Sequence, residues 1–135
     1  MTQTDTDWSE TAISLLKMLV EIPSPSGAED AASSALAEWM TGQRFDAHLD
    51  QAGNCIGYRG DGPNEIVLLG HIDTVPSQLP VIIKDGWLCG RGAVDAKGPL
   101  AAFAMAAALV SIPNDWRVRV IGAVEEEAPT SKGAR

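Results

Sequence analysis

The sequence has few cysteines and no long apolar run. Its two cysteines, Cys55 and Cys89, cannot form a disulfide framework or a thiolate metal site by themselves. No apolar run reaches the ~18 residues that a membrane-spanning helix needs. The N-terminus lacks the basic and apolar regions of a secretory signal. We therefore expect a cytoplasmic protein with free thiols and no membrane partner.

Basic residues are scarce as well. Lys and Arg number 10 against 18 Asp and Glu, so the formal net charge is −8. A nucleic-acid partner would require clustered Lys and Arg, and this balance argues against one. The length of 135 residues suits one domain, and the 45% of hydrophobic residues argue against extended disorder.

Two helical patterns open the chain. Apolar residues recur at helical spacing over 12–20 and again over 32–40. Asp7 is the expected N-cap of the first helix, and Pro23 is expected to end it. The second helix should stop near Gly42, where glycine is a common end signal.

The rest of the chain is dominated by strand patterns. The run 65–70 is apolar after Glu65, as in a strand covered on both faces. The helix expected over 100–110, with Pro99 in its first turn, is apolar on all sides and should therefore be deeply buried. The pattern predicts an α/β fold, with a mainly parallel or mixed sheet and helices on both faces. The strands are expected over 47–50, 55–59, 65–70, 81–83, 87–89 and 118–124.

Polar side chains that can bind metal follow the apolar elements at three places. His71 and Asp73 come directly after an apolar strand, and Asp95 lies in a glycine-rich run just before the apolar helix. The acidic triplet 125–127 follows the last strand. Because ligands gather beyond the carboxyl ends of strands in α/β sheets, these positions are candidates for one site.

Each of these motifs has a structural alternative. His71 and Asp73 can converge on a metal, because residues two apart in extended chain face the same way, or they can simply hydrogen-bond at the strand end. Asp95 can bridge two cations or cap the following helix. The triplet 125–127 can be solvated surface charge, or it can bind a cation, which would offset the repulsion between its carboxylates. Imidazole and carboxylate ligands without thiolate suit Zn, Mn or Co.

Other motif chemistries fail on spacing. The Gly90–Gly92 pair lacks the third glycine of a dinucleotide fingerprint, since Asp95 occupies that position. The sequence contains no Gly-x-Ser-x-Gly elbow, and neither cysteine has a nearby base. Nucleotide binding and covalent nucleophilic catalysis are therefore not supported.

Together, the segments 70–76, 90–98 and 125–127 resemble the motifs of the dinuclear zinc aminoacylase/carboxypeptidase family. This family includes acetylornithine deacetylase, succinyl-diaminopimelate desuccinylase and carboxypeptidase G. The early segment 20–27 is similar to the family's N-terminal loop. The segment 122–135 is most similar to a branch of lysine and arginine biosynthesis. Members of that branch release lysine or ornithine from the γ-carboxyl of the C-terminal Glu of an amino-group carrier protein.

The resemblance implies a role for each motif residue. His71 would ligate one metal, and Asp95 would bridge two metals. Asp73 would orient His71. Glu126 would be the general base, and Glu127 would ligate the other metal. The implied cofactors are two Zn²⁺ ions, with Co²⁺ as the alternative.

The resemblance covers only the first part of such an enzyme. Relatives are more than twice as long and add further ligands, a lid and a dimerisation domain. We therefore expect residues 1–135 to be the N-terminal part of the catalytic domain, inactive alone and homodimeric at full length. His48 is expected at the surface, and the role of Glu125 stays open because most relatives have Asp there.

Two alternatives to the carrier-protein substrate follow from the same resemblance. One is a deacylase or desuccinylase that acts on small acyl-amino acids. The other is a truncated relative without activity.

Overall fold

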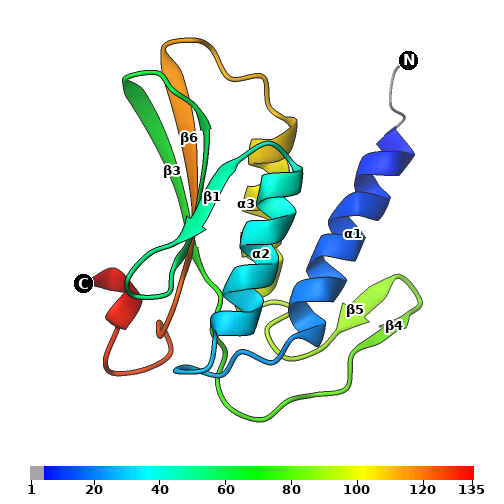
Figure 1. Ribbon diagram of the computed structural model, residues 1–135. Helices are drawn as coiled ribbons and strands as arrows, with labels where there is room; N and C mark the ends of the chain where they lie inside the picture. Colours follow the sequence, from blue (N-terminus) through cyan, green and yellow to red (C-terminus); the bar gives the residue numbers. More distant parts are fainter. Residues whose placement is uncertain (1–4) are drawn as a thin grey trace.

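Helices and a four-stranded sheet make up most of the described chain, which is residues 5–135 of the computed structural model (Figure 1). The helices are α1 (Asp5–Glu21), α2 (Asp30–Gly42) and α3 (Lys97–Leu109), and a short 3-10 helix, η1 (Lys132–Ala134), lies near the C-terminus. The strands are β1 (Asp46–Leu49), β2 (Cys55–Gly60), β3 (Asn64–His71), β4 (Ile82–Lys84), β5 (Trp87–Cys89) and β6 (Trp116–Ala123).

The main sheet is mixed, and β6 lies inside it. Its strand order is β1-β2-β6-β3, and β4 and β5 form a separate hairpin. β2 is antiparallel to both of its neighbours, whereas β3 runs parallel to β6 with His71 opposite Ala123. The predicted mixed sheet, the central position of the last strand and the hairpin are confirmed.

The three helices lie on one side of this sheet (Figure 1). α2 packs on β1 and β2, α3 packs on β3 and β6, and α1 packs on the other two helices. Gly70 and Gly122 are paired across β3 and β6, which makes room for Leu100 of α3. A Cβ atom at Gly122 would lie 3.1 Å from the Leu100 side chain, so a larger residue there would push α3 outward.

The core lies between the helices and the sheet. Each large apolar side chain that is fully buried there contributes about 1.5–3 kcal/mol relative to exposure. These side chains include Leu15, Leu19, Leu36, Met40, Leu100 and Val120.

The predicted helices on both faces of the sheet are found on one face only in the described part of the chain. β3 is an edge strand, and on the face opposite the helices Val67 and Leu69 are 47% and 61% exposed. On the same face, Glu65 pairs with Arg117 and Arg119. A continuous apolar run shows that a strand can be covered, but it does not show which segment covers it.

Two helix predictions also need correction. α1 begins at Asp5, so Asp7 lies within the helix rather than at its N-cap, although α1 ends before Pro23 as predicted. α3 has Pro99 in its first turn as predicted, but Ala102 and Ala106 are exposed. The helix therefore packs on one side only. The sequence did not predict which side, because small apolar residues occur on both.

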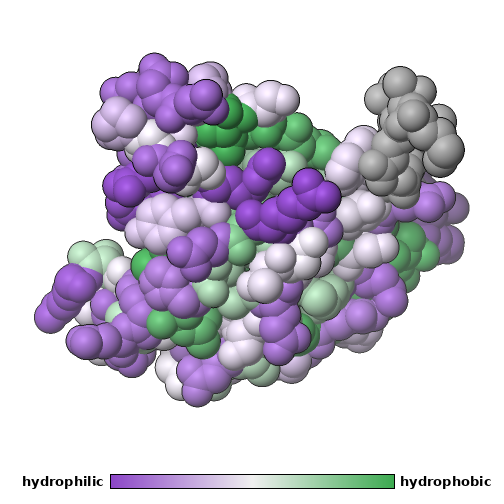
Figure 2. Space-filling view, turned by 45° about the horizontal axis from the view of Figure 1, so that its top comes forward, coloured by the Kyte–Doolittle hydropathy of each residue, from purple (hydrophilic) through white to green (hydrophobic). Residues whose placement is uncertain are grey.

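Figure 2 shows a face on which hydrophilic side chains predominate, with apolar surface exposed in patches between them. Among the described residues, none of the helices is both long and apolar enough to cross a bilayer.

The two thiols are predicted to differ sharply in reactivity. Cys55 is fully buried in β2, and burial raises the pKa of its thiol to about 12, whereas Cys89 is exposed. We expect a thiol reagent at neutral pH to label one site in the folded protein and two in denaturant, measured by intact mass. Fast labelling of a folded Cys89→Ser variant would contradict this packing.

Candidate metal centre

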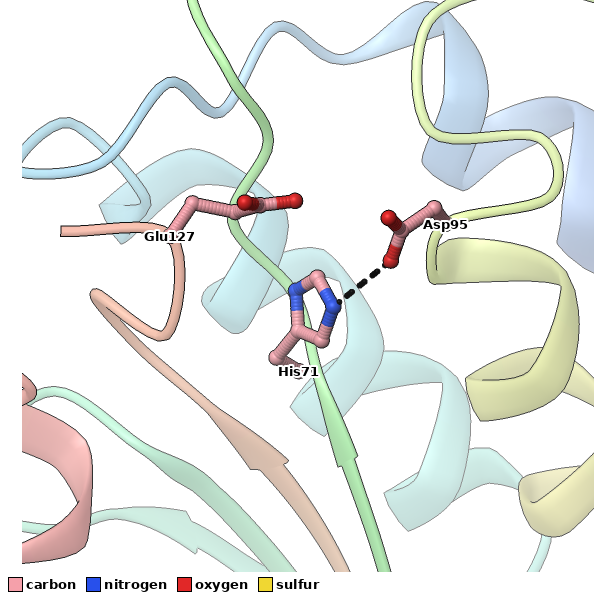
Figure 3. A group of neighbouring side chains, drawn as sticks. All are labelled: His71, Asp95 and Glu127. Carbon is pink, nitrogen blue, oxygen red and sulfur yellow. Dashed lines mark hydrogen bonds and ion pairs between the residues drawn. The ribbon is translucent and has the colours of Figure 1, made fainter.

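Three segments of the chain bring potential metal ligands to one edge of the sheet (Figure 3). His71 ends β3, Asp95 lies in the loop before α3, and Glu127 lies in the turn after β6. One possible ligand atom from each residue lies within 4.8 Å of the other two. The structure thus brings together the three residues that the sequence predicted as metal ligands, because the parallel strands β3 and β6 end at the same edge.

The His71 ring is fixed so that one nitrogen faces the carboxylates. Its Nδ1 lies 3.0 Å from the Asp73 carbonyl oxygen, which can only accept, so Nδ1 donates. Its Nε2 lies 3.0 Å from Asp95 Oδ1 and 3.7 Å from Glu126 Oε2. In the neutral imidazole this Nε2 is an acceptor facing other acceptors. A proton or a metal cation has to lie between them to make the arrangement favourable.

The electrostatics of His71 lead to the same conclusion. Burial lowers its pKa, but the hydrogen bonds to the Asp73 carbonyl and to Asp95, with the charges of Asp73 and Glu126, outweigh this. The net result is a pKa above the usual value for histidine. The charges that stabilise a proton at this position also favour a metal cation.

The candidate site is open to solvent on its carboxylate side. The side chain of His71 is 12% exposed, whereas those of Asp95 and Glu126 are 75% and 59% exposed. A pocket of about 450 Å³, within the usual range of small-molecule sites, is lined in part by His71 and Glu126. A second pocket of about 340 Å³ includes Asp95 and Glu127 in its lining. A substrate group can therefore reach the carboxylates.

Asp73 makes more contacts in the site than the predicted one with His71. Its carboxylate is fully buried and lies 3.4 Å from His71 Nδ1. It also accepts the backbone N–H groups of Glu126 and Glu127 at 3.0 Å each, and the Ser26 hydroxyl at 2.6 Å. Sequence reasoning missed these bonds because backbone donors leave no pattern in the sequence.

The other predicted residues lie outside the cluster. Glu125 has a left-handed backbone with φ of 53°, and its carboxylate accepts the Thr130 hydroxyl. It is not among the three clustered residues. His48 is exposed on β1, as predicted.

Lys97 is a buried cation beneath the Asp95 loop. Its Nζ donates to the carbonyl oxygens of Leu19 at 2.7 Å and Ile22 at 2.6 Å, at the C-terminal end of α1. Its backbone N–H donates to the Gly92 carbonyl at 2.9 Å. Burial lowers the pKa of Lys97 to about 8, so the ammonium still predominates at neutral pH. The side chain ties the loop that carries Asp95 to α1, a role that a single lysine among glycines did not reveal.

Loss of this ammonium should destabilise the fold. We expect Lys97→Met to lower the free energy of unfolding by about 2–4 kcal/mol, because two carbonyls lose a charged donor. Lys17 is the matched control, since it forms an exposed pair with Glu21 on the same helix. Lys17→Met should cost no more than about 0.5 kcal/mol. Urea unfolding measures both, and equal losses would contradict the assigned role of Lys97.

The structure thus shows a mixed α/β sheet with one histidine and several carboxylates beyond the ends of its parallel strands, where ligands of α/β folds gather. The profile of peptidase family M20/M25/M40 matches residues 67–135, and the chain belongs to this family. The family resemblance expected from the motifs is thereby confirmed.

One similar curated protein is the LysW-lysine hydrolase of Deinococcus radiodurans. It is 48% identical to this chain over 98% of the chain and 37% of its own length. The chain thus spans little more than a third of that relative.

Solved structures show the same fold. The di-peptidase Dug1p from Saccharomyces cerevisiae matches 94% of this chain and 34% of its own, with a TM-score of 0.75 and 20% identity. A dinuclear metal-binding peptidase of the M20 family from Bacillus subtilis matches 91% of this chain and 37% of its own. Its TM-score is 0.65 and its identity 19%. The roles of individual residues stay predictions.

Proposed function

We propose that this chain is the N-terminal part of the catalytic domain of a metal-dependent amide hydrolase. The whole enzyme would release lysine or ornithine from the γ-carboxyl of the C-terminal Glu of an amino-group carrier protein. The observation that supports the hydrolase most directly is the cluster of His71, Asp95 and Glu127 at the sheet edge. The named activity of the relative from Deinococcus radiodurans supports the substrate.

The residues present fit a divalent metal. One imidazole and two carboxylates, without thiolate, suit zinc or cobalt. His71, Asp95 and Glu127 would hold the metal, with Asp95 shared between two ions. When bound, the metal pair polarises the scissile carbonyl and makes a water more acidic.

Glu126 is the proposed general base. Its carboxylate is 59% exposed and lies 3.7 Å from His71 Nε2, so it borders the metal position without belonging to the tightest cluster. It would take the proton of the attacking water and deliver it to the leaving amine. The hydrogen bond from the Glu126 backbone N–H to buried Asp73 fixes the position of the main chain from which this carboxylate extends.

The substrate proposal has one competitor. The net charge of −8 gives this chain no general attraction for an acidic carrier protein. A small acyl-amino acid is therefore the alternative substrate. The two substrates are separated by an assay of the full-length enzyme. It compares lysine release from the carrier protein that has lysine attached with lysine release from acetyl-lysine. A homodimer and a cytoplasmic location belong to the same proposal.

Metal binding can be tested on the 135-residue chain itself. We expect calorimetric titration with Zn²⁺ or Co²⁺ to show binding that His71→Ala weakens by at least about 10-fold, because the imidazole ligand is lost. The control is His48→Ala, since this second histidine is exposed on β1, away from the cluster. Equal affinities for the parent and His71→Ala would contradict the proposed site.

Catalysis is tested in the full-length enzyme. Glu126→Gln should lower kcat by about 10²–10⁴-fold, because the amide cannot accept the proton. Metal content should stay the same, as measured by atomic absorption. Glu38→Gln, on the exposed side of α2, is the control and should be unaffected. A Glu126→Gln enzyme with full activity would exclude this residue as the base.

A further inference from the structure

Glu29 is a buried carboxylate outside the metal cluster. It is 5% exposed and directly precedes α2. Its Oε1 accepts the backbone N–H of Gly27 at 2.9 Å and that of Glu125 at 3.0 Å. Burying a carboxylate is unfavourable unless hydrogen bonds compensate, so these two bonds account for its position. The second one joins the start of α2 to the acidic turn 125–127.

The usual local role of such a residue does not apply. Glu29 occupies the N-cap position of α2, but its side chain makes no capping hydrogen bond to that helix. Its carboxylate is directed instead to residues outside the helix. A contribution to the helix end alone therefore does not explain this side chain.

The acidic turn is held by side chains rather than by regular backbone pairing. Three buried residues, Asn54, Glu29 and Asp73, supply the acceptors for four consecutive backbone N–H groups. With one acceptor for each of the four donors, the three side chains define the path of the turn. The bonds run from Val124 to Asn54 at 2.9 Å, from Glu125 to Glu29 at 3.0 Å, and from Glu126 and Glu127 to Asp73 at 3.0 Å each.

Glu29 acts at the most strained residue of this turn. Glu125 has φ of 53°, a left-handed conformation that residues other than glycine adopt at an energetic cost. Such a conformation persists only when surrounding contacts hold it. The bond from the Glu125 backbone N–H to Glu29 holds it directly, and it leads straight into Glu126 and Glu127.

The loop that carries Glu29 is itself fixed against the metal-binding edge. The Thr74 N–H donates to the Ser24 carbonyl at 2.9 Å, and the Ser26 N–H donates to the Thr74 carbonyl at 3.2 Å. The Ser26 hydroxyl donates to Asp73. Glu29 is therefore held rigidly relative to the end of β3 and can transmit that position to the turn.

We propose that Glu29 is a positioning residue of the metal centre. By accepting the Glu125 N–H, it sets the conformation of the turn and so places the Glu127 carboxylate for the metal and the Glu126 carboxylate for proton transfer. This rests on the proposed function for its catalytic consequence. The placement of the turn is a property of the 135-residue chain alone.

The first test measures the turn without any metal. Glu29→Ala removes the acceptor, whereas Glu29→Gln keeps an oxygen that both N–H groups can use. We expect Glu29→Ala to speed hydrogen exchange of the Glu125 to Glu127 backbone amides by about 10–100-fold. This factor corresponds to the loss of one hydrogen bond to a charged group. Glu29→Gln should restore most of the protection. The amides that bond to Asp50 are the internal control and should not change.

The second test measures the consequence for the metal and for catalysis. In Zn²⁺ titrations, Glu29→Ala should bind about 10-fold or more weakly and Glu29→Gln nearly as tightly as the parent. In the full-length enzyme, Glu29→Ala should lower kcat by about 10–100-fold with little change in KM, because Glu29 is buried and acts through the turn. Glu38→Ala is the matched control on α2.

The outcomes separate the two proposals. Unchanged exchange in Glu29→Ala, or faster exchange with unchanged metal affinity, overturns the role of Glu29. Absence of hydrolysis by the full-length parent overturns the proposed function, while exchange and Zn²⁺ titration still decide about Glu29. If Glu29→Ala does not fold, Glu29→Asp carries the same test, since it keeps the charge but shortens the side chain.

Discussion

The parallel pairing of β3 with β6 determines where every other part of the site lies. Because His71 is opposite Ala123, the strand-end histidine and the turn after β6 emerge side by side. The same register pairs Gly70 with Gly122, and Leu100 packs over both. This contact places the start of α3, and with it the loop of Asp95. One backbone pairing thus arranges side chains from three distant segments.

Acidic residues serve two different purposes around this edge. Asp95 and Glu126 are exposed, and they face a pocket or border the histidine. Asp73 and Glu29 are buried, and the bonds of their carboxylates go largely to backbone N–H groups. The exposed group keeps its oxygens available for a cation or a proton. The oxygens of the buried carboxylates accept hydrogen bonds from the backbone, which holds the exposed carboxylates in place.

The sequence predicted the parts of the site that depend on local pattern. His71, Asp95 and the acidic triplet were recognisable because each adjoins an apolar element whose end the pattern marks. Glu29 and Lys97 were missed because they act on backbone groups 96 and 75–78 residues away. The side of the sheet that the helices cover was likewise not predictable, since an apolar strand reads the same on either face.

The cluster of His71, Asp95 and Glu127 has a thermodynamic consequence for the chain. Its three donors are separated along the sequence by β4, β5, α3 and β6, so they are close together only after the sheet has formed. In an unfolded chain the metal-binding side chains are far apart, so each contacts a cation singly and the chain binds it weakly. Any ion held at this edge therefore stabilises the folded state in proportion to the logarithm of its concentration, and the sheet and the ion become parts of one equilibrium.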